Sequence, residues 1–126
     1  MKADLKALLA KITNTPIIVE QGTSGNWTYR KWSNGTAECW ESKSLGSVAI
    51  TSPEGYGYYA GVPASYFPTG LFTGGPTITF GVHGGGGLVS FCPNTVASTY
   101  YSGYLWCSAS STRSVTIYTH AIGKWK

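Results

Sequence analysis

The feature that most constrains the fold of this chain is a pair of short, β-prone segments joined by a turn sequence. Residues Trp27–Trp32 and Ala37–Trp40 are rich in aromatic side chains, and Ser33-Asn34-Gly35-Thr36 lies between them. Asn-Gly at the centre of a two-residue turn adopts the positive φ angles of a type I′ hairpin, whose twist matches that of the flanking strands. The sequence therefore predicts a β-hairpin over residues 27–40.

A two-residue turn also fixes which residues face each other across this hairpin. It sets Lys31 opposite Glu38 and Tyr29 opposite Trp40, an ion pair and an aromatic pair of the kind that stabilises antiparallel strands. Apolar side chains fall on both faces of the predicted hairpin. We therefore expect both faces to be covered.

The rest of the chain alternates short strand-like runs with turn residues. It contains 17 glycines and 6 prolines without a G-X-Y period, and no helical pattern alternates with the strands. Further strands are expected at Pro16–Glu20, Ser47–Thr51, Tyr56–Ala60, Thr77–Val82, Leu88–Cys92, Thr99–Cys107 and Ser114–Ile122. Many short strands with turn signals about every ten residues indicate an all-β fold, an antiparallel β-sandwich or jelly-roll.

The start of the chain has helical rather than strand periodicity. Its apolar residues are spaced i, i+3, i+4 and i+7 and form one stripe: Leu5, Leu8, Leu9 and Ile12. A helix of about ten residues is marginal in water, so the stripe must pack on its own domain or on copies of itself. We expect an N-terminal helix at residues 1–15, for packing or oligomerisation, and a β-sandwich domain at residues 16–126.

Charged side chains are scarce and unevenly placed. They make up 11% of the 126 residues, and Glu54 is the only formal charge between Leu45 and Thr112. Nucleic-acid binding needs several cations gathered on one face, so the net charge of +4 does not predict it. No run approaches the ~20 apolar residues of a membrane span. We expect neither a nucleic-acid partner nor membrane insertion.

Few residues are suited to metal binding or nucleophilic catalysis. The chain has three cysteines (Cys39, Cys92 and Cys107) and two histidines (His83 and His120), without metal-ligand spacing. We expect no metal and no cofactor. The thiols are interpreted as three buried apolar groups in a protein made in a reducing cytoplasm, with one disulfide and a free thiol as the alternative.

Two weaker motifs also argue against an enzyme. The run His83-Gly84-Gly85-Gly86-Gly87 lacks the Lys-Ser/Thr ending and the helix of a phosphate-binding loop, so we interpret it as a hairpin tip. Glu38 and Glu41 could supply the carboxyl pair of a glycosidase, but Lys31 is the expected partner of Glu38. We therefore expect no catalytic residues.

Aromatic residues crowd two stretches of the chain, around residues 56–67 and 100–106. Tyr and Trp bury a large area and keep a polar tip, which suits stacking on saccharides. The candidate ligand-binding residues are Tyr56, Tyr58, Tyr59, Tyr66, Phe67 and Tyr104. Alternate residues of a strand point to opposite faces, so the competing interpretation places part of this set in the core or in contacts between subunits.

Two stretches near opposite ends of the chain resemble a known family. Residues Ile18–Gly22 and Gly25–Trp40, which include Trp-Thr-Tyr-Arg-Lys-Trp-Ser-Asn-Gly-Thr, resemble the segment that opens the C-terminal domain of phage minor structural proteins. These proteins occur in phages and prophages of Gram-positive bacteria. The ending Ala121–Lys126 resembles the terminal motif of the same family. Residues 43–112 match no motif of the family.

The resemblance implies a virion protein of the phage tail, assembled in the bacterial cytoplasm, with a β-sandwich or jelly-roll tip. It also implies a homotrimer that contacts other tail proteins, and no catalytic residues. The aromatic clusters and the resemblance together favour a trimeric fibre or receptor-binding tip that contacts cell-wall saccharide on the host. Two alternatives remain: a tail assembly or scaffold component that binds no receptor, and a cell-wall hydrolase domain.

Overall fold

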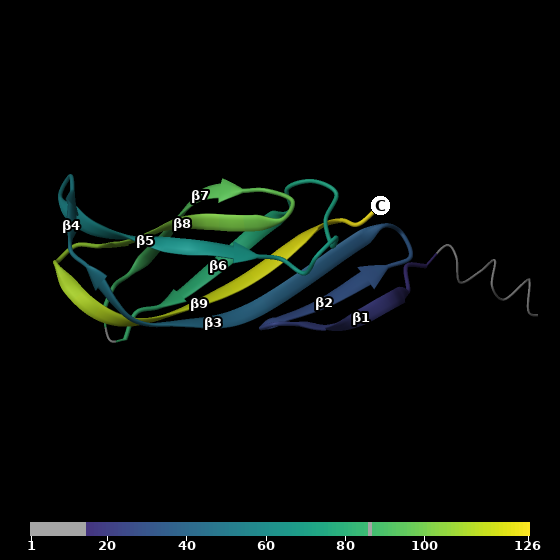
Figure 1. Ribbon diagram of the computed structural model, residues 1–126, viewed down its shortest axis with the longest axis horizontal. Helices are drawn as coiled ribbons and strands as arrows, with labels where there is room; N and C mark the ends of the chain where they lie inside the picture. The colour runs from purple at the N-terminus through teal and green to yellow at the C-terminus, as the bar shows by residue number, and fades with distance from the viewer. Residues whose placement is uncertain (1–14, 86) are drawn as a thin grey trace, which may run out of the picture.

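The computed structural model describes residues 15–85 and 87–126, and this part of the chain forms nine β-strands and no helix (Figure 1). The strands are β1 (Ile18–Ser24), β2 (Trp27–Trp32), β3 (Thr36–Ile50), β4 (Ser52–Glu54), β5 (Gly57–Tyr66), β6 (Thr77–His83), β7 (Ser90–Val96), β8 (Tyr100–Cys107) and β9 (Ser111–Lys124). The expected N-terminal helix and its stripe of Leu5, Leu8, Leu9 and Ile12 fall on residues 1–14, outside the described residues.

The nine strands form two antiparallel sheets. Sheet A has the order β1-β2-β3-β9-β6, and sheet B has the order β4-β5-β8-β7. Figure 1 shows sheet B lying over one part of the longer sheet A, while the β1–β2 hairpin extends beyond it. The prediction of an all-β, antiparallel fold is confirmed, and the two facing sheets fit a sandwich.

The chain crosses between the sheets at both ends of the sandwich. β3 passes directly into β4 through Thr51, residues 67–76 lead from β5 back to β6, and residues 108–110 join β8 to β9. Gly84, Gly85 and Gly87 lie in the connection from β6 in sheet A to β7 in sheet B. The interpretation of this run as the tip of a hairpin between neighbouring strands is therefore wrong.

Apolar side chains from both sheets fill the space between them. One cluster contains Trp27, Ala37, Cys39, Phe67, Leu71, Phe72, Tyr101 and Ala121, and the other contains Ile50, Val62, Leu105, Cys107, Val115 and Ile117. Phe80 and Phe91 pack against both clusters, with their ring centroids 4.6 Å apart. Each large apolar side chain buried in this way contributes about 1.5–3 kcal/mol to folding.

The 27–40 hairpin forms, but its register differs by one residue from the prediction. Arg30 pairs with Glu38 and Lys31 pairs with Ala37, because three residues rather than two connect the strands. Gly35 takes the positive φ of 91° that this connection requires. A slip of one residue exchanges the two faces of a strand. As a result Ala37 and Cys39 enter the core, and Glu38 points outward.

The C-terminal segment packs against the turn of this hairpin. Thr36 pairs with Lys124, the Trp125 amide donates to the Gly35 carbonyl at 2.9 Å, and the Trp125 indole donates to the Trp32 carbonyl at 2.8 Å. Lys31 lies over the Trp125 ring at 5.3 Å from its centroid. The two stretches on which the family resemblance rests therefore form one structural unit, although they lie far apart in the sequence.

Candidate functional site

The two sheets differ in charge. Glu54 is the only charged residue in the strands of sheet B. The strands of sheet A contain eight: Glu20, Arg30, Lys31, Glu38, Glu41, Lys43, Arg113 and Lys124. The outer face of sheet B is thus a surface of aromatic, hydroxyl and glycine residues with a single carboxylate.

Strand alternation decides which aromatic side chains reach this outer face. On β5, Tyr58 packs toward the core cluster around Val62, and the neighbouring Tyr59 points away from it. On β8, Leu105 is buried, while Tyr104 and Trp106 on either side of it line the surface. The antiparallel register places Tyr59 directly beside Trp106. Three aromatic rings from two neighbouring strands therefore meet on one face.

These rings line a surface hollow of about 350 Å³, which we call the sheet-B hollow. Its lining residues are Glu54, Tyr59, Cys92, Tyr104 and Trp106. The rings of Tyr59 and Tyr104 meet edge to face, with centroids 5.7 Å apart and planes at 82°. The volume lies within the range of about 300–1,000 Å³ that is usual for small-ligand sites. Apolar ring faces beside a carboxylate and phenol hydroxyls suit a ligand that is apolar on one face and rich in hydroxyls at its edges.

A glycine on β5 sets the position of one wall of this hollow. A Cβ atom added to Gly57 would lie 2.3 Å from the Trp106 ring. The indole of Trp106 therefore lies directly against the backbone of Gly57, and any side chain at position 57 would overlap it. Because Gly57 has no side chain, Trp106 can occupy the base of the hollow.

The structure divides the aromatic residues that the sequence singled out. Tyr59 and Tyr104 line the sheet-B hollow, whereas Tyr58 faces inward and Phe67 is a core residue that is 5% exposed. Phe67 packs edge to face on Trp27, with centroids 5.4 Å apart. Phe67 is therefore removed from the set of candidate surface residues.

The other two candidates lie outside the hollow. Tyr56 is fully exposed between β4 and β5, and Tyr66 is exposed beside Tyr100, with ring centroids 5.6 Å apart.

The sequence analysis did not select Trp106 or Glu54 as ligand-binding residues, although both line the hollow. The signal for Trp106 was its spacing of two from Tyr104, which puts both side chains on the same face of a strand.

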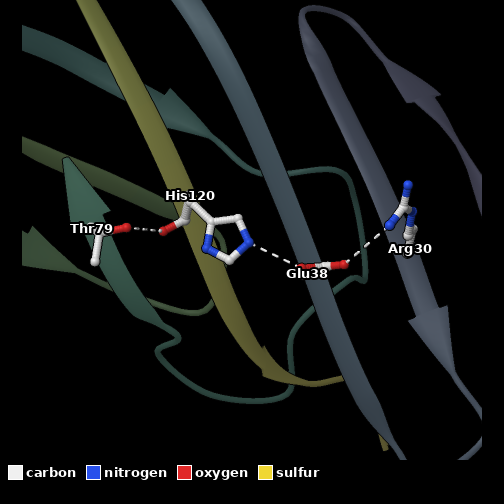
Figure 2. A network of polar contacts seen from close by, with 4 residues as sticks. All are labelled: Arg30, Glu38, Thr79 and His120. Carbon is white, nitrogen blue, oxygen red and sulfur yellow. Dashed lines mark hydrogen bonds and ion pairs between the residues drawn. The ribbon is translucent and has the colours of Figure 1, made fainter. Parts of the chain in front are cut away.

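The outer face of sheet A carries a polar network instead. Figure 2 shows Glu38 on β3 between Arg30 on β2 and His120 on β9. Its carboxylate oxygens lie 3.8 Å from Arg30 Nη1 and 3.0 Å from His120 Nε2. The Thr79 hydroxyl on β6 donates to the His120 carbonyl at 3.5 Å. This network links four neighbouring strands of sheet A.

A second hollow, of about 430 Å³, lies over the same strands of sheet A. Trp40, Ser42, Gly81, Tyr118 and His120 are among its lining residues. Two of them already have partners: Arg30 lies 5.0 Å above the Trp40 ring, and His120 pairs with Glu38. In the sheet-B hollow, no described cation lies within ion-pair distance of Glu54. Glu54 in the sheet-B hollow is therefore more available to a ligand than His120 in the sheet A hollow.

The two acids that could have formed a catalytic pair lie on opposite sides of sheet A. Glu38 points outward, whereas Glu41 is buried at 6% exposure between the sheets. Glu41 Oε1 accepts a hydrogen bond of 2.9 Å from the Ser65 hydroxyl and one of 3.5 Å from the Tyr101 hydroxyl. Burial raises the pKa of Glu41, and the hydrogen bond from Ser65 opposes this rise in part.

The three cysteines do not form a disulfide. Cys39 and Cys107 are buried, but Cys92 is exposed, so the interpretation of three buried thiols is wrong for Cys92. Burial, with the nearby Glu41 and Glu38 carboxyls, raises the pKa of Cys39 to about 12. Among the described residues, no group of three or more His, Cys, Asp or Glu side chains could hold a metal ion.

No described helix is long and apolar enough to span a membrane.

The sequence matches no protein-family model and no curated protein. Two solved structures are similar in fold. An N-truncated R1-type pyocin tail fiber matches with a TM-score of 0.63 and 14% identity, over 93% of this chain and 94% of that chain. A C-terminal fragment of the P. aeruginosa R1 pyocin fiber matches with a TM-score of 0.61 and 15% identity, over 83% of this chain.

This chain spans 28% of the second, longer fragment. At such low identities the similarity concerns the fold alone. Nearly all of both chains is covered in the first comparison, so the shared feature is the arrangement of the whole domain rather than a local motif. The chain therefore has the fold of a domain found in R1-type pyocin tail fibers.

Proposed function

We propose that this chain is a non-enzymatic structural domain of a phage-type tail, a trimeric fibre or receptor-binding tip that contacts saccharide on the host surface. The observation that carries the proposal is the fold similarity to an R1-type pyocin tail fiber over 93% of this chain and 94% of that one. The resemblance to phage minor structural proteins rests on different evidence, the residues at the two ends of the chain, and leads to the same class of protein.

The placement of the ionisable groups supports a binding rather than a catalytic role. A glycosidase needs two carboxyls that face one bond. Glu38 and Glu41 lie on opposite faces of sheet A, and Glu54 belongs to sheet B. His120 is paired with Glu38 rather than with a serine or cysteine nucleophile. Glu38 and Glu41 therefore do not form the facing carboxyl pair that this mechanism needs.

Assembly from copies of the same chain is supported by apolar residues near the start. Leu5, Leu8, Leu9 and Ile12 form one stripe in the sequence, and burying such a stripe needs a partner. The residues that open the described part continue this apolar character: Ile17, Ile18 and Val19 are exposed in succession. A homotrimer buries both groups around one axis. In the virion this trimer would join other tail proteins and present the sandwich outward.

Receptor contact is assigned to the sheet-B hollow. Tyr59, Tyr104 and Trp106 offer ring faces, and Glu54 offers acceptor oxygens. Sugar rings stack on aromatic faces through their C–H groups and bind polar neighbours through their hydroxyls, so the lining suits a saccharide.

Binding of the labelled 126-residue chain to intact cells tests this function. A panel of Gram-positive and Gram-negative bacteria would also test the Gram-positive host that the family resemblance predicts. We expect binding to a subset of strains, reduced at least tenfold by Tyr104→Ala and unchanged by Tyr118→Ala, a tyrosine on the outer face of sheet A. If no strain is bound, the domain is an assembly or scaffold component. Release of soluble fragments from purified cell wall would identify a hydrolase instead.

A further inference from the structure

We propose that the sheet-B hollow selects neutral over anionic saccharides, and that Glu54 is the residue that sets this selectivity. The inference rests on the proposed saccharide contact at this face and names the chemical class of the ligand. It follows from the position of one carboxylate within an otherwise uncharged aromatic surface.

The aromatic walls define how a sugar ring can enter. Tyr59 and Tyr104 stand edge to face, so one ring presents its flat side where the other presents its edge. Tyr104 is 42% exposed and offers the more accessible ring face. A sugar ring that stacks on Tyr104 brings its equatorial hydroxyls toward the other residues of the lining. Glu54 is the carboxylate in that lining.

Among the described residues, no cation lies within ion-pair distance of the Glu54 carboxylate. Of the five cations in the strands of sheet A, Arg113 acts on Cys107 of β8 and donates to the Ser111 hydroxyl, and the backbones of facing sheets are ~10 Å apart. The Debye length at physiological ionic strength is about 8 Å, so charges beyond the far sheet are largely screened at this surface. Glu54 therefore places a negative charge at the hollow.

A negative hollow distinguishes ligands by charge. Hydroxyl groups of a neutral sugar can donate charge-assisted hydrogen bonds to the Glu54 carboxylate, which are stronger than bonds between neutral groups. A sugar that bears a uronic acid or phosphate group would bring a second negative charge close to Glu54. Two like charges within a few ångströms repel each other, so such a sugar would bind less tightly. Selectivity against anionic glycans thus follows from a single repulsive contact.

The outer face of sheet A is the natural contrast. The hollow there is lined by His120, which pairs with Glu38, and Arg30 lies over the Trp40 ring nearby. This surface carries charges of both signs, so it has no comparable reason to exclude an anion. A difference between neutral and anionic ligands should therefore depend on sheet B.

Binding to an array of immobilised glycans tests the inference. The array carries oligosaccharides of neutral hexoses and N-acetylhexosamines, their uronic-acid or phosphate-bearing counterparts, and free amino sugars. We expect the 126-residue chain to bind neutral glycans at least tenfold more tightly than anionic ones of the same linkage. Glu54→Gln should weaken neutral binding several-fold and reduce the neutral-to-anionic ratio to about threefold or less. Glu20→Gln, which removes an exposed carboxylate of sheet A, is the matched control and should change neither value.

Each alternative result overturns the inference in a recognisable way. Equal binding of anionic and neutral glycans, or an unchanged ratio in Glu54→Gln, removes the role of Glu54. Tighter binding of anionic glycans than of free amino sugars would contradict a negative charge in the hollow. Binding to cells without binding to any glycan leaves the receptor contact in place but identifies a different ligand. A fall in solution mass for Tyr104→Ala would make this face a subunit contact.

Discussion

Glu41 is the one charged side chain that is buried in the described part of the chain. It lies between the sheets, where the hydroxyls of Ser65 and Tyr101 approach its carboxyl, and Tyr101 is within 3.2 Å of the Thr119 hydroxyl. These four residues belong to β3, β5, β8 and β9, so the cluster connects both sheets. A polar cluster of this kind stabilises the fold only while all of its members are hydrogen-bonded.

The raised pKa of Glu41 predicts how the stability of the fold depends on pH. The folded state holds this proton more tightly than the unfolded chain, whose carboxyl titrates near 4.5. The contribution of Glu41 to folding is therefore most favourable below pH 4.5 and is lost as the pH rises through the raised folded value. Glu41→Gln abolishes this titration and keeps an oxygen that can accept from Ser65. In urea unfolding, the stability of the wild type relative to Glu41→Gln should decrease between pH 4 and pH 7. Parallel pH curves for the two proteins would contradict this account.

Gly57 provides a second test at the level of one residue. The added methyl group of Gly57→Ala would overlap the Trp106 ring and force the indole or the strand to move. We expect a loss of about 1–3 kcal/mol in the free energy of unfolding, typical of an overpacked site, together with weaker saccharide binding. Gly61→Ala is the control, because its Cβ would meet no atom within 4 Å. Equal behaviour of the two variants in urea unfolding would show that Trp106 does not depend on Gly57.

At the level of elements, the hairpin and most strands could be predicted, but their ends and register could not. The sequence predicted separate strands at 37–40 and 47–51, whereas β3 runs without interruption over Thr36–Ile50. Local composition disfavours a strand at Ser42–Gly46. Pairing with β9 along the whole strand supplies the hydrogen bonds that the local sequence does not reveal, with an irregularity between Ser44 and Gly46. The register error has the same origin, because the partner of a strand decides which face is buried.

The contact of the C-terminal segment with the hairpin turn predicts a stability effect. Trp125→Ala removes the indole that donates to the Trp32 carbonyl and packs beside Lys31, and should cost about 1–3 kcal/mol. Trp125→Phe keeps a ring but loses the hydrogen bond, and should cost about 0.5–1.5 kcal/mol. Lys126→Ala removes an exposed ammonium group 4.9 Å from the centroid of the Trp125 ring and should cost no more than about 1 kcal/mol. Chemical denaturation of the three variants orders these effects. If Trp125→Ala left the free energy of unfolding unchanged, the contact of the C-terminal segment with the hairpin turn would not stabilise the fold.

At the level of the whole molecule, the sandwich separates a charged sheet from a nearly uncharged one. The sequence already showed a long and nearly uncharged middle, but only the pairing of strands assigns β4, β5, β7 and β8 of that middle to one sheet and β6 to the other. The candidate site likewise depends on strand pairing that the sequence does not reveal. Tyr59 and Tyr104 could be chosen from composition, whereas Trp106 and Glu54 join them through cross-strand neighbours and through the short strand β4, which sequence reasoning did not predict.

The central claim is that this domain works as an assembly of identical copies, as expected for a trimeric tail fibre. The direct test is the mass of the 126-residue chain in solution, measured by light scattering across a range of protein concentrations. The account predicts a mass of three times 13.4 kDa that does not change on dilution. A stable mass of 13.4 kDa, that of a single chain, would contradict it.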